Sequence, residues 1–98
     1  MNSISNKKTM PLAEALFRVK GELRLINRAL DVGDNQKVLI HRISLKELLE
    51  RLRHSLALST RESTIDNILL SASKEIMRLA DTTLDNASGY LSSCLLSQ

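Results

Sequence analysis

The stretch TRESTIDNILLSASKEIMRLADTTLDNA, residues 60–87, contains neither proline nor glycine. Its small and apolar residues recur at steps of three and four, which places them along one face of an α-helix. An apolar face of this length has to be covered by other parts of the fold. We therefore predict one long helix over 60–87, around which the rest of the chain packs. The predicted face consists of Ile65, Ile68, Ala72, Ile76, Leu79, Thr83 and Ala87.

The composition of the chain favours helices over sheets. Hydrophobic residues make up 43% of the 98 residues, but only Phe17 and Tyr90 are aromatic. A core of leucine, isoleucine, valine and alanine with three glycines and one proline is typical of packed helices. We predict an all-α protein with a flexible N-terminal tail over 1–10 and a single helical domain over 11–98.

A first helix is predicted to begin at Pro11, because proline suits the first position of a helix. Gly33 can adopt the left-handed conformation that ends this helix, and Asp34 or Asn35 can cap the next one. The segment therefore predicts a helix and then a turn at 31–35. The apolar stripe of the first helix consists of Leu12, Leu16, Val19, Leu23, Ile26 and Leu30.

A second helix is predicted over 45–58, where leucines recur at helical spacing after a capping box formed by Ser44 and Glu47. Residues 36–43 fit either a short strand or an extension of this helix, since they are apolar and rich in β-branched residues. Ser59 or Thr60 could cap the third helix directly afterwards.

The predicted architecture is a three-helix antiparallel bundle with one long C-terminal helix. The short joint at residues 59–60 predicts that the second and third helices form a hairpin. Ser88 and Gly89 are predicted to end or bend the third helix, with a last short helical turn after them. The third helix is longer than the second, so the first helix, the C-terminal tail or a second copy of the chain has to cover the rest of its stripe. We expect dimerisation to complete the bundle.

Three basic residues, Lys20, Arg24 and Arg28, follow one another at steps of four in the first helix. Phe17 and Leu25 widen the apolar stripe beside them. Such a ridge is either a solvated surface or a contact strip for phosphates or an acidic protein surface. We predict partner binding at these five residues. Gly21 lies inside the same helix at a cost of about 1 kcal/mol relative to alanine, which suggests the close approach of another helix.

The net charge of +3 is unevenly distributed along the chain. Residues 1–30 carry +4, residues 31–60 carry +1 and residues 61–98 carry −2. The basic part and the acidic part can therefore attract each other within the fold or across a dimer. An isoelectric point near 9.4 is also compatible with nucleic-acid binding.

The segment KVLIHRISLKELLERLRHSLALSTRESTIDNILL, residues 37–70, resembles ribbon-helix-helix repressors in outline. The resemblance implies a short strand, a helix, a tight turn and a second helix, with the strands of two chains paired in the major groove of DNA. The side chains available to a strand over 38–43 are too apolar to read base edges, and the expected turn glycine near Ala57 is absent.

The sequence contains no catalytic or metal-binding signature. His41 and His54 have no Cys, Asp or Glu at a ligand-like offset, so we expect His41 to be half-buried and bonded to the backbone, and His54 to pair with Glu50. The single cysteine, Cys94, has no base near it in the sequence and favours a reducing compartment. We predict no enzymatic activity, no cofactor, no membrane span and a cytoplasmic location.

Two functions remain open from the residues alone. The first is a small protein-interaction module of the adaptor, chaperone or inhibitor kind, acting through exposed apolar helix faces and the basic ridge as a homodimer with a protein partner. The alternative is a DNA-binding transcriptional regulator of the ribbon-helix-helix type.

Overall fold

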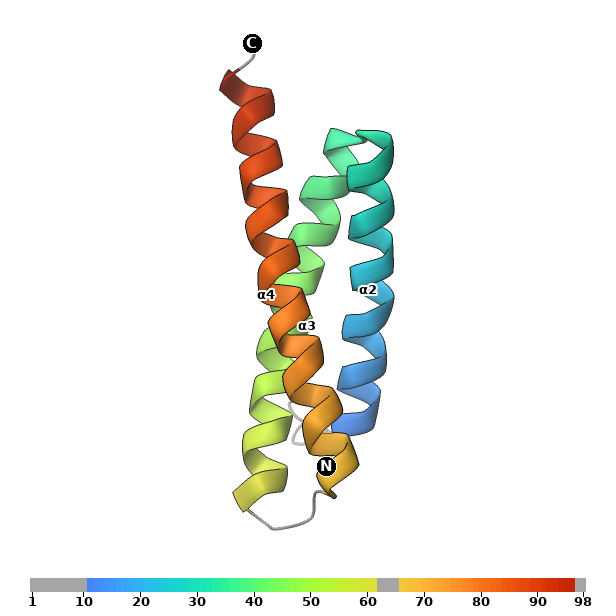
Figure 1. The fold of residues 1–98 in the computed structure, drawn as a ribbon, viewed down its shortest axis with the longest axis vertical. Helices are drawn as coiled ribbons and strands as arrows, with labels where there is room; N and C mark the ends of the chain where they lie inside the picture. Colours follow the sequence, from blue (N-terminus) through green and yellow to red (C-terminus); the bar gives the residue numbers. More distant parts are fainter. Residues whose placement is uncertain (1–10, 62–65, 97–98) are drawn as a thin grey trace, which may run out of the picture.

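The computed structural model describes residues 11–61 and 66–96. It contains three helices, α2 (Leu12–Val32), α3 (Asn35–Arg61) and α4 (Asn67–Leu96), and the described residues form no strand. In Figure 1 the chain runs up along α2, returns along α3 and rises again along α4, and each helix packs against the other two. The all-α prediction is confirmed. None of the helices in the described ranges is long and apolar enough to cross a membrane.

The connection between α2 and α3 consists of Gly33 and Asp34 alone. Gly33 has a φ of 72°, the left-handed conformation that glycine adopts without strain, and its N–H donates to the carbonyl of Leu30 at 3.3 Å. The carboxylate of Asp34 accepts the N–H of Lys37 at 3.2 Å and so caps α3. The predicted turn at 31–35 is confirmed.

Helix α3 is continuous from Asn35, so residues 36–43 are helical. The predicted helix start at the Ser44–Glu47 capping box is wrong, because Ser44 lies inside α3. Asp34 already caps the helix, and Val38 and Leu45, seven residues apart, are both buried in the core. That burial holds the β-branched segment in the helical conformation, and the strand required by the ribbon-helix-helix outline is not formed.

The third helix begins later than predicted. Ser59 and Thr60 are not its caps, since α3 continues to Arg61, and the Thr60 hydroxyl donates to the carbonyl of Leu56 at 2.7 Å. Helix α4 follows Asp66, whose carboxylate accepts the N–H of Leu69 at 2.8 Å. The predicted helix over 60–87 is therefore wrong at its N-terminal end. Ile65 of the predicted stripe lies outside the described residues.

Helix α4 also ends later than predicted, because it passes through Ser88 and Gly89 without a break and continues to Leu96. Tyr90 and Leu91, which follow the glycine, pack against the core. Their burial outweighs the cost of about 1 kcal/mol for a glycine inside a helix. The last turns of α4 extend beyond the turn between α2 and α3 (Figure 1).

The core lies between the three helices and confirms the predicted stripe of α2, except that Leu16 and Leu30 are only partly buried. In α4 the buried face differs from the prediction, since Ile68 is 83% exposed and Leu79 is 42% exposed. The fully buried positions of α4 are small and seven residues apart, which lets the neighbouring helices come close. They are Ser73, Ala80 and Ala87.

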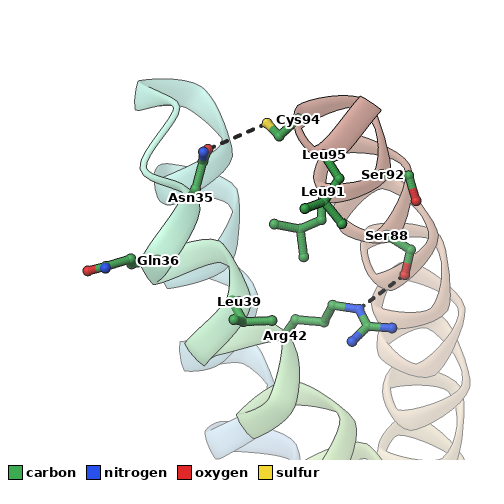
Figure 2. A pocket seen from close by; sticks show the side chains of 9 residues that line it. All are labelled: Asn35, Gln36, Leu39, Arg42, Ser88, Leu91, Ser92, Cys94 and Leu95. Atoms are coloured by element: carbon green, nitrogen blue, oxygen red, sulfur yellow. Dashed lines mark hydrogen bonds between the residues drawn. The ribbon is translucent and has the colours of Figure 1, made fainter. Parts of the chain in front are cut away.

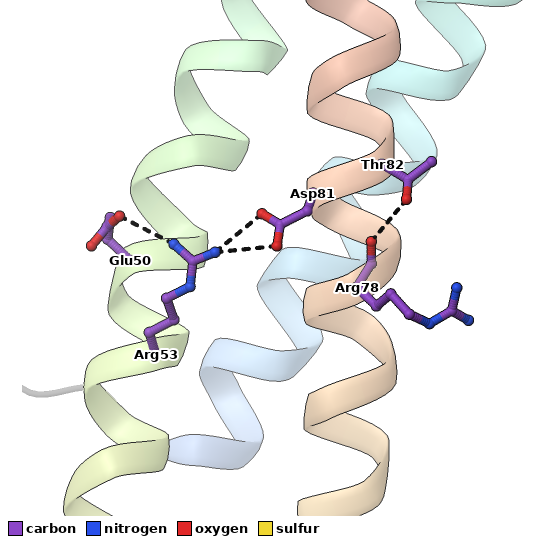
Figure 3. A network of polar contacts seen from close by, with 5 residues as sticks. All are labelled: Glu50, Arg53, Arg78, Asp81 and Thr82. Atoms are coloured by element: carbon purple, nitrogen blue, oxygen red, sulfur yellow. Dashed lines mark hydrogen bonds and ion pairs between the residues drawn. The ribbon is translucent and has the colours of Figure 1, made fainter.

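Surface ion pairs connect α3 to α4. The guanidinium group of Arg53 donates to both carboxylate oxygens of Asp81 at 3.1 and 3.3 Å and to Glu50 of its own helix at 3.3 Å (Figure 3). In the same region of α4 the Thr82 hydroxyl donates to the backbone carbonyl of Arg78. These groups are exposed, so each pair contributes on the order of 0–1 kcal/mol.

Candidate protein-binding surfaces

All five residues predicted to bind a partner lie on one side of α2 and are exposed. We call this surface the basic face and define it as Phe17, Lys20, Arg24, Leu25 and Arg28. Phe17 is 76% exposed and Leu25 is 46% exposed, because the core residues of α2 lie on the opposite side of the helix. The structure thus brings the five residues together on one surface, and the prediction that Phe17 and Leu25 widen the buried stripe is wrong.

The cations of the basic face have no carboxylate partner among the described residues. Arg18, on the same helix, shows the contrast, since its guanidinium group pairs with Glu14 at 3.1 Å. Lys20, Arg24 and Arg28 follow one another at intervals of about 6 Å along the helix. This spacing presents a row of three positive charges over about two turns, with Phe17 and Leu25 beside it.

Val32 extends the basic face and was missed by the sequence analysis. It is 69% exposed and lies seven residues after Leu25, which places both on the same side of α2. Gly21 lies between Phe17 and Leu25 on this surface. A Cβ atom built on Gly21 would have no neighbour within 4 Å. The predicted close approach of another helix at Gly21 is therefore wrong for the described chain.

A second surface lies where the start of α3 faces the end of α4 (Figure 2). It is a groove of about 450 Å³, which we call the end groove. Its apolar walls come from Leu39 on α3 and from Leu91 and Leu95 on α4. Leu91 points from α4 towards α3 in Figure 2, above the side chain of Arg42. The complete lining is Asn35, Gln36, Leu39, Arg42, Ser88, Leu91, Ser92, Cys94 and Leu95.

Polar contacts close the two ends of the end groove. At one end the Nε atom of Arg42 donates to the hydroxyl of Ser88 at 3.1 Å. At the other end the side-chain oxygen of Asn35 accepts hydrogen bonds from the Tyr90 hydroxyl and from the Cys94 thiol, the latter at 3.6 Å. Desolvation, followed by the hydrogen bond and the charge of Cys94, raises the pKa of Tyr90 above its ordinary value. The phenol therefore stays protonated and donates to Asn35.

An exposed apolar strip on α3 continues from the end groove. Leu39 is 47% exposed, and Ile40 and Ile43 are 58% and 53% exposed. The offsets of three and four residues put Ile43 beside both of the others on the helix surface. The sequence analysis missed this strip because residues 36–43 fitted a strand as well as a helix. We define the apolar strip as Leu39, Ile40 and Ile43.

The two predicted histidine contacts, His41 with the backbone and His54 with Glu50, are not the contacts that the structure shows. The Nδ1 atom of His41 lies 2.9 Å from the carboxylate of Glu22, so His41 connects α3 to α2 rather than bonding to the backbone. Glu50 pairs with Arg53 instead of His54. Within the two described ranges, no three His, Cys, Asp or Glu side chains converge in a way that could hold a metal ion.

Comparisons with protein-family models, with curated proteins and with solved structures found no match to this chain.

Proposed function

We propose that this chain is a small, non-catalytic protein-interaction module whose basic face binds an acidic protein surface. The observation that supports the proposal is the row of three cations that have no carboxylate partner in the described parts of the chain, with Phe17 and Leu25 exposed beside them. Arginine and aromatic side chains are enriched in protein interfaces and supply much of their binding energy. The cations would direct an acidic partner to the surface, and the apolar side chains would hold it.

We also propose that the three helices are antiparallel, that a second copy completes the bundle by dimerisation, and that the protein works in the reducing cytoplasm.

A distinct acidic partner suits the basic face better than a second copy does. Among the described residues, the exposed carboxylates that form no ion pair, such as Glu47 and Asp85, lie on different helices and form no row that matches Lys20, Arg24 and Arg28. An acidic helix with carboxylates at steps of four would match that row.

DNA binding is the competing function. Three cations at this spacing could also contact phosphates. However, the resemblance to ribbon-helix-helix repressors required a strand over residues 38–43, and this segment lies inside α3. The exposed Phe17 and Leu25 suit an apolar partner surface better than a phosphate backbone. We therefore propose the protein-binding function alone.

The test uses a designed helical peptide with glutamates at steps of four and leucines beside them, titrated against the protein by fluorescence anisotropy. We expect Arg24→Glu combined with Arg28→Glu to weaken binding at least about tenfold, because two attractive contacts become repulsive. The matched control is Arg51→Glu combined with Lys74→Glu, which changes the net charge equally on α3 and α4. Equal losses in both variants, or tighter binding of duplex DNA than of the peptide, would contradict the proposal.

A further inference from the structure

We propose that the end groove is a self-association interface, occupied by a second copy of this chain. Two grooves face each other across a two-fold axis, and Leu95 of each copy enters the groove of the other between Leu39 and Leu91. This interface lies on α3 and α4, whereas the proposed function rests on α2. The two proposals are therefore separable by experiment.

The apolar side chains at this end of the bundle form one surface that the chain does not cover. Leu95 is 73% exposed at the rim of the end groove, and the apolar strip on α3 continues from the opposite wall. The end of α4 extends beyond the turn between α2 and α3, so neither of the other two helices covers this part of α4 (Figure 1). A second copy supplies the missing wall and removes these side chains from water.

The charges around the end groove favour a second copy over an acidic or basic partner. Its polar lining consists of neutral amide, hydroxyl and thiol groups, with Arg42 as the only charged residue. Across a two-fold axis each group near the axis meets its own copy, so like charges there would repel. Hydroxyl and amide groups both donate and accept hydrogen bonds, and therefore they can pair with copies of themselves.

Arg42 does not prevent this arrangement. Its guanidinium group lies at the end of the groove nearest the centre of the bundle, where it donates to Ser88 (Figure 2). Asp81 and Asp85 line a more polar pocket that also contains Arg42 and Lys46, so this pocket holds two cations and two carboxylates and has no net charge. The charge thus lies away from Leu95.

The size of the surface indicates a reversible dimer. Residues 35–43 of α3 and 88–95 of α4 each extend for roughly 12 Å, which is short for a protein interface. Interfaces that bury less than about 1,200 Å² in total are typical of weak, transient complexes. We therefore expect a dissociation constant in the micromolar range, on the order of 1–100 µM.

Sedimentation velocity over a concentration series tests the interface. The average mass should rise from 11.0 kDa towards twice that value with increasing concentration. Leu95→Lys should raise the dissociation constant at least about tenfold, because the new ammonium group would have to be buried between the apolar side chains of Leu39 and Leu91 of the other copy. The matched control is Ile68→Lys, at the other end of α4, which should dimerise like the wild type. A monomer at all concentrations, or equal effects of both variants, would overturn the proposal.

Spin labels locate the contact independently of stability. In a Cys94→Ser background, labels at Lys46→Cys and at Arg61→Cys report on the two halves of α3. If the end grooves face each other, the distance between the two labels of a dimer is shorter for residue 46 than for residue 61. The reverse order would place the contact at the other end of the bundle and overturn the proposal.

The two proposals fail differently. Charge reversal at Arg24 and Arg28 should leave the dimer intact, and Leu95→Lys should leave peptide binding by the monomer intact. Loss of peptide binding alone therefore concerns the basic face, and loss of self-association alone concerns the end groove. Dimerisation that disappears in the Arg24 and Arg28 variant while Leu95→Lys has no effect would overturn the end-groove interface.

Discussion

The basic face and the end groove expose similar apolar side chains but surround them with different charges. On α2, Phe17 and Leu25 lie beside three cations that have no carboxylate partner among the described residues. At the end groove, the exposed Leu95 lies among neutral polar groups. Exposed apolar area indicates that a surface binds something, and the charges around it indicate what kind of partner fits.

This difference in charge indicates that the end groove suits a second copy of the chain, whereas the basic face suits a different protein. A row of like charges repels its own copy, so the basic face is unsuited to a two-fold contact. Arg42 is the one charge in the described lining of the end groove, which therefore lacks a row of charges that would select an acidic partner. One small bundle can thus hold a dimer contact on α3 and α4 and keep α2 available for a different molecule. The following experiments test this comparison.

The largest expected effect is on the stability of the whole bundle, which positions both surfaces. Ile26 is fully buried and fixes α2 against the other helices. Ile26→Ala should lower the free energy of unfolding by about 2–5 kcal/mol, because it removes buried methylene groups and leaves a cavity. Urea unfolding followed by circular dichroism measures this change. Ile26→Val, as the control, should cost only about 0.5–1.5 kcal/mol. Equal stability of all three proteins would show that α2 is not held by this core.

Salt should weaken binding at the basic face but not self-association at the end groove. Raising the NaCl concentration from about 50 to about 500 mM should weaken binding of the glutamate peptide to the basic face at least about tenfold, because exposed charges are screened. Self-association through the end groove should be unchanged or slightly stronger, since apolar contacts are not screened by salt. Anisotropy and sedimentation in the same buffers measure both quantities. If dimerisation weakened with salt as strongly as peptide binding does, the proposed difference between the two surfaces would be wrong.

The two helical glycines should respond alike although they lie beside different surfaces. No atom lies within 4 Å of a Cβ built on Gly21 of α2 or on Gly89 of α4. Gly21→Ala and Gly89→Ala should each raise the free energy of unfolding by about 0.5–1 kcal/mol, because alanine favours the helix. Thermal unfolding measures the gain. A loss of stability in either variant would indicate a close neighbour at that glycine.

The smallest effect is expected for the ion pair between α3 and α4. Arg53→Ala should lower the free energy of unfolding by roughly 0.5 kcal/mol, because the pair with Asp81 is exposed to solvent. Arg51→Ala, whose side chain is exposed on the same helix, is the control. The difference between the two variants should vanish at high salt. Neither variant should change peptide binding or self-association, since Arg53 lies outside both surfaces.

The sequence predicted the features that depend on local patterns. The stripe of α2 from Leu12 to Ile26 and the turn at Gly33 follow from helical spacing and from the conformation that glycine allows. The exposure of Lys20, Arg24 and Arg28 followed from the same spacing, but Phe17 and Leu25 were expected to widen the apolar stripe and are exposed instead.

The start of α3 and both ends of α4 could not be predicted, because contacts between residues distant in sequence determine them. Ser44 and Gly89 carry local signals for a helix start and a helix end, yet both lie inside helices whose neighbouring residues are buried in the core. The end groove was missed for the same reason. It depends on residues 36–43 being helical and on α4 continuing to Leu96, and both outcomes arise from contacts between helices that are distant in sequence.

The two-residue turn at Gly33 and Asp34 has a consequence for hydrogen exchange. It joins α2 and α3 by a very short loop, so this hairpin loses little entropy on closing and should form early in folding. The end of a helix is its least hydrogen-bonded part, and Leu95 near the end of α4 is largely exposed. Amide protons near the C-terminus of α4 should therefore exchange fastest, and occupation of the end groove should slow them.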